Sequence, residues 1–150
     1  MKNLQSYTGL QAIDAKTAAL SPLARKLRMR AADRVAVVNS PPAYLAQLQP
    51  APGDMHVEVK PDQSFDVVQL FVNNVDELRN LGANAVRAVK PDGLLWVCYP
   101  KGGQKAGTDL HRDVLWDLMG KQTGLVGVSL VAVDEKWSAM RFRAADKVGT

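Results

Sequence analysis

Residues 65–99 of this chain read FDVVQLFVNNVDELRNLGANAVRAVKPDGLLWVCY, and this stretch decides the fold. Phe65–Val72 and Leu94–Tyr99 are short apolar runs, which are typical of strands buried on both faces of a parallel sheet. The segment between them begins with the capping-box spacing Asn74-Val-Asp-Glu77 and continues with apolar residues at helical intervals. It stops at Lys90-Pro-Asp-Gly93. The stretch therefore predicts a strand–helix–strand unit with parallel strands.

Shorter elements precede this unit. Ser21 as N-cap and Pro22 at the first helical position predict a helix, and the apolar run Arg34–Val38 predicts a second buried strand. Residues 43–49 favour two helical turns, and Met55–Lys60 favours a strand. Few residues separate that strand from the next one, whereas a parallel crossover needs about a dozen. It is therefore either very short or an antiparallel edge strand, and both alternatives stay open.

The segments after the unit complete the predicted domain. Thr108 or Asp109 is expected to cap a helix that carries apolar side chains inward as far as Met119. The β-rich runs Leu125–Val133 and Trp137–Arg143 predict an antiparallel hairpin. We therefore expect an α/β protein with one doubly wound, mostly parallel sheet that ends in this hairpin. Residues 21–150 would form a single domain, and residues 1–20 a loose N-terminal arm.

The composition is that of an ordinary globular protein. Of 150 residues, 47% are hydrophobic and 23% are charged, close to the globular average. No apolar run approaches the roughly 18 residues of a membrane span, and residues 1–20 lack the apolar stretch of a secretory signal. The single cysteine, Cys98, fits a reducing compartment, so a cytoplasmic location without membrane contact is expected. The net charge of +4 is a mild basic excess, compatible with an anionic partner.

The order of these elements resembles a class I methyltransferase that has been shortened in its middle. Four features carry the resemblance: Phe65-Asp-Val-Val68, the amphipathic helix after it, Lys90-Pro-Asp-Gly-Leu-Leu-Trp96 and the closing hairpin. They are similar to the second half of that superfamily. The resemblance implies a truncated Rossmann-type fold. It implies little about chemistry, because these motifs are mainly helix-stop and strand-start signals.

The chain also resembles a family of short bacterial proteins that contain a domain of unknown function. The similar segments are Pro22–Leu27, Arg34–Tyr44, Leu95–Lys101, Thr108–Asp113 and Asp134–Phe142. Together they span most of residues 21–143. Because no activity is attached to that family, the resemblance implies a shared fold and assigns no catalytic residue.

The turn after the first strand lacks the glycines that a nucleotide-binding sheet places there. Such glycines let the backbone approach a phosphate or an adenosyl group at a helix N-terminus. Here the turn is Asn39-Ser-Pro-Pro-Ala-Tyr44, whose two prolines remove amide donors. Binding of S-adenosylmethionine in the usual mode is therefore not expected, and no cofactor is predicted. Asn39 and Tyr44 are candidates to contact a ligand in a cleft at the strand's end, and a purely structural turn is the alternative.

The strongest local signal is Tyr99–Asp109, which joins the end of a strand to the start of a helix. Open α/β sheets bind ligands at this carboxyl edge, and lysines, glycines and a helix N-terminus together suit an anion. The candidate anion-binding residues are Lys101, Gly102, Gly103, Lys105, Thr108 and Arg112. The spacing is not that of a Walker loop. Asp109 would compete for the same amides, so a solvated loop whose Asp caps its own helix is the alternative.

A basic cluster lies on the first helix. Arg25, Lys26 and Arg28 are a candidate patch for nucleic acid. No aromatic residue is interleaved to stack on bases, so a solvated helix face is the simpler interpretation and nucleic acid is not the expected partner.

No catalytic set or metal site is predicted. His56 and His111 lack a second metal ligand at a supporting interval, and Cys98 in a buried strand is typical of an inert core residue. The sequence favours a non-catalytic, degenerate methyltransferase-like domain that binds a protein or a small anion. One alternative is an S-adenosylmethionine-dependent methyltransferase or other transferase with an atypical cofactor site. Another is a nucleic-acid-associated protein that uses the basic helix.

Overall fold

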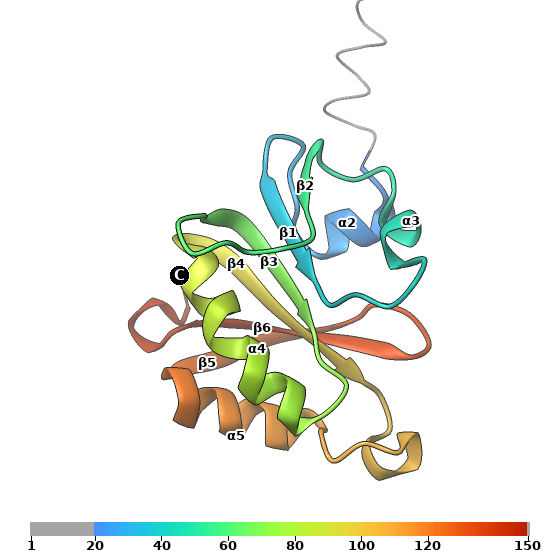
Figure 1. The fold of residues 1–150 in the computed structure, drawn as a ribbon, viewed down its shortest axis with the longest axis vertical. Helices are drawn as coiled ribbons and strands as arrows, with labels where there is room; N and C mark the ends of the chain where they lie inside the picture. Colours follow the sequence, from blue (N-terminus) through green and yellow to red (C-terminus); the bar gives the residue numbers. More distant parts are fainter. Residues whose placement is uncertain (1–19, 150) are drawn as a thin grey trace, which may run out of the picture.

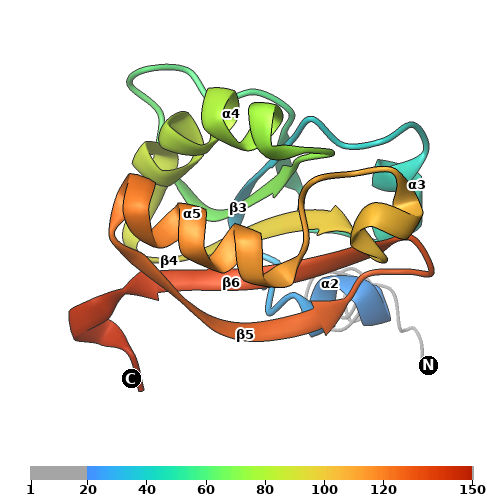
Figure 2. The ribbon, with the colours of Figure 1, turned by 90° about the horizontal axis from the view of Figure 1, so that it is seen from below.

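The computed structural model describes residues 20–149, which form a six-stranded sheet with helices on both faces (Figure 1, Figure 2). The strands are β1 (Arg34–Val38), β2 (Asp54–His56), β3 (Phe65–Phe71), β4 (Val89–Pro100), β5 (Leu125–Ala132) and β6 (Trp137–Ala144). The helices are α2 (Pro22–Lys26), α3 (Tyr44–Leu48), α4 (Val75–Ala88) and α5 (Arg112–Thr123), with 3-10 turns η1 (Gly103–Ala106) and η2 (Ala145–Lys147). The predicted N-terminal arm lies, up to residue 19, outside the described residues.

The sheet order is β2-β1-β3-β4-β6-β5. Strands β1 to β4 run parallel, and β6 and β5 add an antiparallel hairpin at one side. This confirms the predicted sheet. It also settles the direction of the short strand, because β2 has three residues and runs parallel to β1, with Arg34 opposite Asp54. Residues 57–64 then lead to β3 without a helix.

The helices cover the sheet in two layers, with α4 and α2 on opposite sides (Figure 2). Helices α4 and α5 pack on one face through Leu78, Ala85, Leu115 and Met119. Helices α2 and α3 pack on the other face through Ala24, Leu27, Tyr44 and Leu48. No described helix is both long and apolar enough to cross a membrane.

Local caps behave largely as the sequence predicts. Ser21 caps α2, accepting a hydrogen bond from the amide of Ala24 at 3.0 Å. Asn74 caps α4, and its side-chain oxygen accepts from the amide of Glu77 at 2.9 Å. The Glu77 carboxylate reaches back one residue further than a capping box requires, to the amide of Asn73 at 2.8 Å. Glu77 therefore ties the end of β3 to the first turn of α4.

The predicted start of the next helix at Thr108 or Asp109 is wrong. Helix α5 begins at Arg112, with His111 as its N-cap. The physical reason is that both polar side chains find backbone partners outside α5. The hydroxyl of Thr108 donates to the carbonyl of Asn73 at 2.6 Å, and the Asp109 carboxylate accepts from the amide of Val75 at 3.0 Å.

Residues 95–100 of β4 are buried, with side chains in the clusters on both faces of the sheet, as predicted. Trp96 and Cys98 are 1% and 0% exposed and belong to the cluster under α2 and α3. Burial raises the pKa of the Cys98 thiol to about 12, although the Gln69 amide donates to its sulfur at 3.3 Å. The thiol is therefore protonated and inaccessible at neutral pH.

The predicted helix stop is an irregularity inside β4. Val89 lies opposite Phe65 and Leu94 opposite Val67, so residues 90–93 bulge out of the ladder. A Cβ atom on Gly93 would lie 2.7 Å from the carbonyl oxygen of Asp66. Because that oxygen belongs to a paired strand and cannot rotate away, only glycine fits at this position.

We expect Cys98 to resist a thiol reagent in the native protein, because the thiolate is absent and the sulfur is covered. Labelling should follow global unfolding, measured by mass spectrometry at neutral pH with and without denaturant. Rapid labelling of the folded protein would contradict the burial of β4.

Replacing Gly93 with Ala should lower the free energy of unfolding by about 1–3 kcal/mol, because β3 and β4 must shift to admit the methyl group. The measurement is the urea midpoint. Gly53→Ala is the matched control, because a Cβ there meets no atom within 4 Å, and it should unfold like the parent. Equal midpoints for both variants would refute the close approach at Gly93.

Candidate functional site

The carboxyl end of β4 opens into a cleft of about 670 Å³, which we call the β4 cleft. Its lining comes from residues 99–105, from residues 111–113 at the start of α5, and from Leu130 and Ser138 of the hairpin. Parallel α/β sheets bind their ligands at this edge. The volume lies in the range of roughly 300–1,000 Å³ that small-molecule sites occupy.

Five of the six predicted anion-binding residues line this cleft: Lys101, Gly102, Gly103, Lys105 and Arg112. Gly102 and Gly103 have φ angles of 97° and 51°, a left-handed conformation that other residues rarely adopt. These two glycines let the chain leave β4 and turn directly into η1, which brings Lys101 and Lys105 to one rim.

Thr108, the sixth predicted residue, holds the loop in place and does not line the cleft. Its hydroxyl joins the loop to Asn73, and the neighbouring Asp109 carboxylate caps α4 at Val75. From the sequence, Asp109 is expected to compete with an anion for the first amides of its own helix. In the structure this carboxylate instead binds an amide of a different helix.

The start of α5 therefore has no carboxylate cap of the predicted kind. His111 makes no side-chain hydrogen bond to the first-turn amides, and a helix N-terminus with uncapped amides carries a partial positive charge. His111, Arg112 and Asp113 all line the cleft. Asp113 is the acidic residue of that first turn, and its carboxylate lies 3.3 Å from Nε of Arg112.

Lys101 is anchored at the rim by the β5–β6 turn. Its side-chain ammonium donates to the carbonyl of Asp134, and its backbone amide donates to the carbonyl of Lys136. Burial alone would raise the pKa of Asp134, but hydrogen bonds from the amides of Trp137 and Lys136 lower it overall. The turn is thus a charged, well-bonded support for Lys101.

Tyr99 forms the wall of the cleft next to β4. It is 5% exposed, and burial raises the pKa of its phenol while the nearby Arg112 partly opposes that rise. At neutral pH the phenol is therefore protonated and offers one hydrogen-bond donor.

Two cleft residues that the hairpin contributes were not predicted from the sequence. Leu130 and Ser138 reach the cleft because β6 pairs with β4, with Ser138 opposite Tyr99. No local motif marks these positions. The only available signal was the predicted hairpin, whose place beside β4 could not be read from its own residues.

Asn39 and Tyr44, the predicted ligand-cleft residues, make contacts within the protein; Asn39 directly follows β1, and Tyr44 is the first residue of α3. The Asn39 amide donates to the carbonyl of Phe71 at 2.9 Å and to the carboxylate of Glu77 at 3.0 Å. Tyr44 is 1% exposed, and its hydroxyl bonds to the Gln69 amide. Burial raises the pKa of that hydroxyl far above its usual value. The structure does not bring these two residues to the β4 cleft.

The predicted basic patch lies on the other side of the sheet from α4 and α5. Arg25, Lys26 and Arg28 are all exposed, and α2 packs on the opposite sheet face. Among the described residues, no group of three or more His, Cys, Asp or Glu side chains is placed to hold a metal ion.

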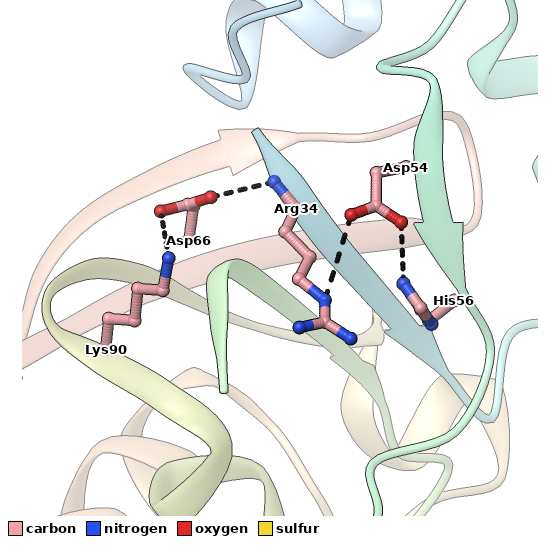
Figure 3. A network of polar contacts seen from close by, with 5 residues as sticks. All are labelled: Arg34, Asp54, His56, Asp66 and Lys90. Carbon is pink, nitrogen blue, oxygen red and sulfur yellow. Dashed lines mark hydrogen bonds and ion pairs between the residues drawn. The ribbon is translucent and has the colours of Figure 1, made fainter. Parts of the chain in front are cut away.

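A polar network occupies the amino-terminal edge of the sheet (Figure 3). Asp66 accepts from the backbone amide of Arg34 at 2.8 Å and pairs with Lys90 at 3.1 Å. Asp54 lies 2.7 Å from Nε2 of His56 and 3.8 Å from Nε of Arg34. The network joins the starts of four adjacent strands, which indicates a structural role.

Within this network, the Arg34 side chain has a nitrogen atom that makes no hydrogen bond. Its Nε atom is buried without a hydrogen-bond partner among the described residues. The guanidinium instead lies 5.1 Å from the centre of the Phe65 ring, a cation–π contact that partly compensates.

Comparisons with solved structures show a methyltransferase-like fold. The N-methyltransferase NodS from Bradyrhizobium japonicum WM9, in complex with S-adenosyl-L-homocysteine, matches with a TM-score of 0.55 and 12% identity, covering 94% of this chain and 86% of that one. The ribosomal protein L11 methylase from Lactobacillus delbrueckii subsp. bulgaricus matches with a TM-score of 0.52 and 11% identity, covering 81% and 76%. No protein-family model and no curated protein sequence matches the chain.

These neighbours confirm the predicted fold and share it at low identity. At 11% and 12% identity the likeness shows the fold alone and assigns no activity to this chain. The site residues themselves are not tested by this likeness, because a fold hosts many functions.

The contribution of Asp66 to stability should depend on pH. Its pKa is lowered, first by the hydrogen bond from the Arg34 amide and then by Lys90, although burial opposes this. A lowered folded-state pKa contributes stability above the unfolded value of about 3.9, and this is lost as pH falls through the folded-state pKa.

We therefore expect Asp66→Asn to flatten the acid side of the stability curve. Urea midpoints measured between about pH 6 and pH 2.5 should fall less steeply for the variant than for the parent. Asp62→Asn, an exposed acid of the preceding loop, is the matched control and should follow the parent. Parallel curves for Asp66→Asn and the parent would show that this carboxylate does not stabilise the strand starts.

Proposed function

We propose that this chain is a transferase of the methyltransferase-like fold that binds a small anionic molecule in the β4 cleft. The observation that carries the proposal is the convergence of Lys101, Lys105 and Arg112 on one cleft at the carboxyl edge of the sheet. The cleft contains one carboxylate, Asp113, against these three cations. Asp113 lies 3.3 Å from Nε of Arg112, so an anion would share Arg112 with this carboxylate and gain further attraction from Lys101 and Lys105.

The backbone supports the same ligand class. The first turn of α5 has no side-chain cap and its residues Arg112 and Asp113 line the cleft, where the helix dipole favours a negative charge by about 0.3–1 kcal/mol. The phenol of Tyr99 and the hydroxyl of Ser138 add polar groups that could orient a ligand. Carboxylate and phosphate groups match these donors equally well, and both occur in transferase substrates and cofactors.

The transferase part of the proposal rests on the comparisons. One neighbour, NodS, is a methyltransferase whose structure contains S-adenosyl-L-homocysteine. In this chain we expect the turn after β1 not to hold such a cofactor in the usual mode. Two prolines remove amide donors, and the Asn39 amide is held by Phe71 and Glu77. An adenosyl-type cofactor would need an atypical site, and the β4 cleft offers cations for its carboxylate.

A simpler anion-binding domain is the second candidate. The cations of the cleft are sufficient for this candidate, because binding an anion does not require that the bound molecule also reacts. The two candidates differ in the ligand, so one titration series separates them.

The test follows the backbone amides by NMR during titration with phosphate, S-adenosylmethionine and S-adenosyl-L-homocysteine. The transferase proposal expects all three to shift amides within residues 101–114, with the adenosyl compounds bound more tightly. The affinity should fall as salt rises, because exposed charges are screened over about 8–10 Å. Shifts with phosphate alone would support the second candidate. Adenosyl shifts centred on residues 39–44 would place the cofactor at β1 and contradict the cleft assignment.

Variants sharpen this measurement. The double change Lys101→Ser and Arg112→Ser should weaken binding about tenfold, equivalent to about 1.4 kcal/mol. Lys121→Ser is the matched control, because Lys121 is exposed on the same helix but pairs with Asp117 at 3.0 Å outside the cleft. Unchanged affinity in the double variant, with its fold intact by NMR, would remove the cleft from consideration.

A further inference from the structure

Three arginines from two separate elements converge on the sheet face that carries α2. Arg28 follows the last residue of α2 by two positions, and Arg141 and Arg143 lie on β6. Residues two apart on a strand share a face, and Trp137 and Ala139 of the same β6 face belong to the cluster under α2. We call Arg28, Arg141 and Arg143 the arginine cluster.

A buried hydrogen bond places Arg28 within this cluster. The indole nitrogen of Trp96 donates to the carbonyl oxygen of Leu27 at 3.0 Å. Trp96 lies directly opposite Arg141 where β4 pairs with β6. The end of α2 is therefore pinned beside Arg141, and Arg28 is the next residue along the chain.

The backbone of Arg28 adopts a conformation that normally belongs to glycine. Its φ angle is 64°. The amide of Met29 donates to the carbonyl of Ala24, and that of Arg28 donates to the carbonyl of Arg25. This is the Schellman arrangement that ends a helix, and its left-handed position favours glycine. An arginine here accepts backbone strain, and strained residues concentrate at functional positions.

The positive charges of the cluster act on one another, and Arg143 also has an acidic neighbour, because the pKa of Asp92 is lowered first by Lys147 and also by Arg143. The pKa of Arg141 is lowered, first by burial and then by the positive charges of Arg28 and Arg143. Ser129 is a neutral partner of Arg141, at 3.4 Å from its Nε atom. Folding thus brings like charges together and adds Arg25 and Lys26, both exposed, on the adjacent turn of α2.

We propose that this arginine cluster binds the phosphodiester backbone of a nucleic acid. Guanidinium groups match phosphate oxygens in geometry and charge. The cations are spread along α2 and β6 and are supplied by two elements, which suits a linear polyanion with regularly spaced phosphates. The binding is independent of base sequence, because Phe142, the aromatic residue between Arg141 and Arg143, is buried on the opposite face of the sheet and offers no ring for a base to stack on.

The experiment measures binding of a duplex of about 20 base pairs and of a single-stranded oligonucleotide by fluorescence anisotropy over a range of salt. The logarithm of the affinity should fall with the logarithm of salt, with a slope of about −3 on duplex DNA for three neutralised phosphates. Arg141→Ser should reduce the magnitude of that slope by about one and weaken binding severalfold. Arg79→Ser, an exposed arginine of α4, is the matched control and should change neither.

Arg28 offers a variant that cannot be confused with misfolding. Arg28→Gly should raise the melting temperature, because glycine relieves the left-handed strain, and yet weaken oligonucleotide binding severalfold. Arg28→Lys should retain most of the affinity. Parent-like binding by Arg28→Gly and Arg141→Ser would overturn the proposal.

Two further ligands identify the chemistry. Poly-glutamate of matched length should bind more weakly than the oligonucleotide, and equal binding would overturn the assignment to phosphate. Inorganic phosphate should compete only at millimolar concentration. Tight binding of inorganic phosphate at Arg141, without oligonucleotide binding, would assign the cluster to a small phosphate and contradict a nucleic acid.

Discussion

The parallel pairing of β3 with β4 is the constraint on which the rest of this structure depends. The two strands are in register from Val67 opposite Leu94 to Phe71 opposite Cys98. Gly93 lets β4 enter that register, since any side chain there would collide with the carbonyl of Asp66. Once β4 is seated, its carboxyl end sets the β4 cleft, and its Trp96 receives the end of α2. The candidate site and the arginine cluster are thus both positioned by one strand.

Competition for helix caps shapes the edge of the sheet. Asp109 caps α4 and leaves the start of α5 to His111, while Glu77 bonds to Asn73 and to Asn39. Acidic side chains are therefore drawn toward the ends of β1 and β3. The end of β4 keeps Lys101, Lys105 and Arg112. The Asn39 side chain next to β1 is bonded to Phe71 and Glu77, while the cationic β4 cleft lies two strands away along the same edge.

The sequence correctly predicted those features that depend on residues only a few positions apart. Ser21 with Pro22 and Asn74 marked two helix starts correctly, because a cap and its amides are only a few residues apart. The apolar run Arg34–Val38 became a strand with the predicted bounds. The helix start at Thr108 or Asp109 was wrong because their partners, Asn73 and Val75, lie far away along the chain. The direction of β2 depended on its pairing with β1, which no periodicity reveals.

The β4 cleft and the arginine cluster differ in the same way: the residues of the first are close together in the sequence, and those of the second are not. Lys101 and Arg112 belong to one continuous segment, so a local pattern of lysines and glycines is enough to indicate that loop as a candidate site. Arg28 and Arg141 lie near opposite ends of the chain and meet only because Trp96 binds the carbonyl of Leu27. No local pattern in the sequence can indicate that meeting.

A sequence that specifies one fold normally avoids both a left-handed arginine and a group of like charges. Here both occur at one place, and neither improves the packing of the core beneath them, which is completed by Trp96, Trp137 and Ala139. Core packing therefore does not explain the left-handed arginine, whereas binding of a polyanion, as we propose for this cluster, does. Three guanidinium groups on one face suit a negatively charged partner.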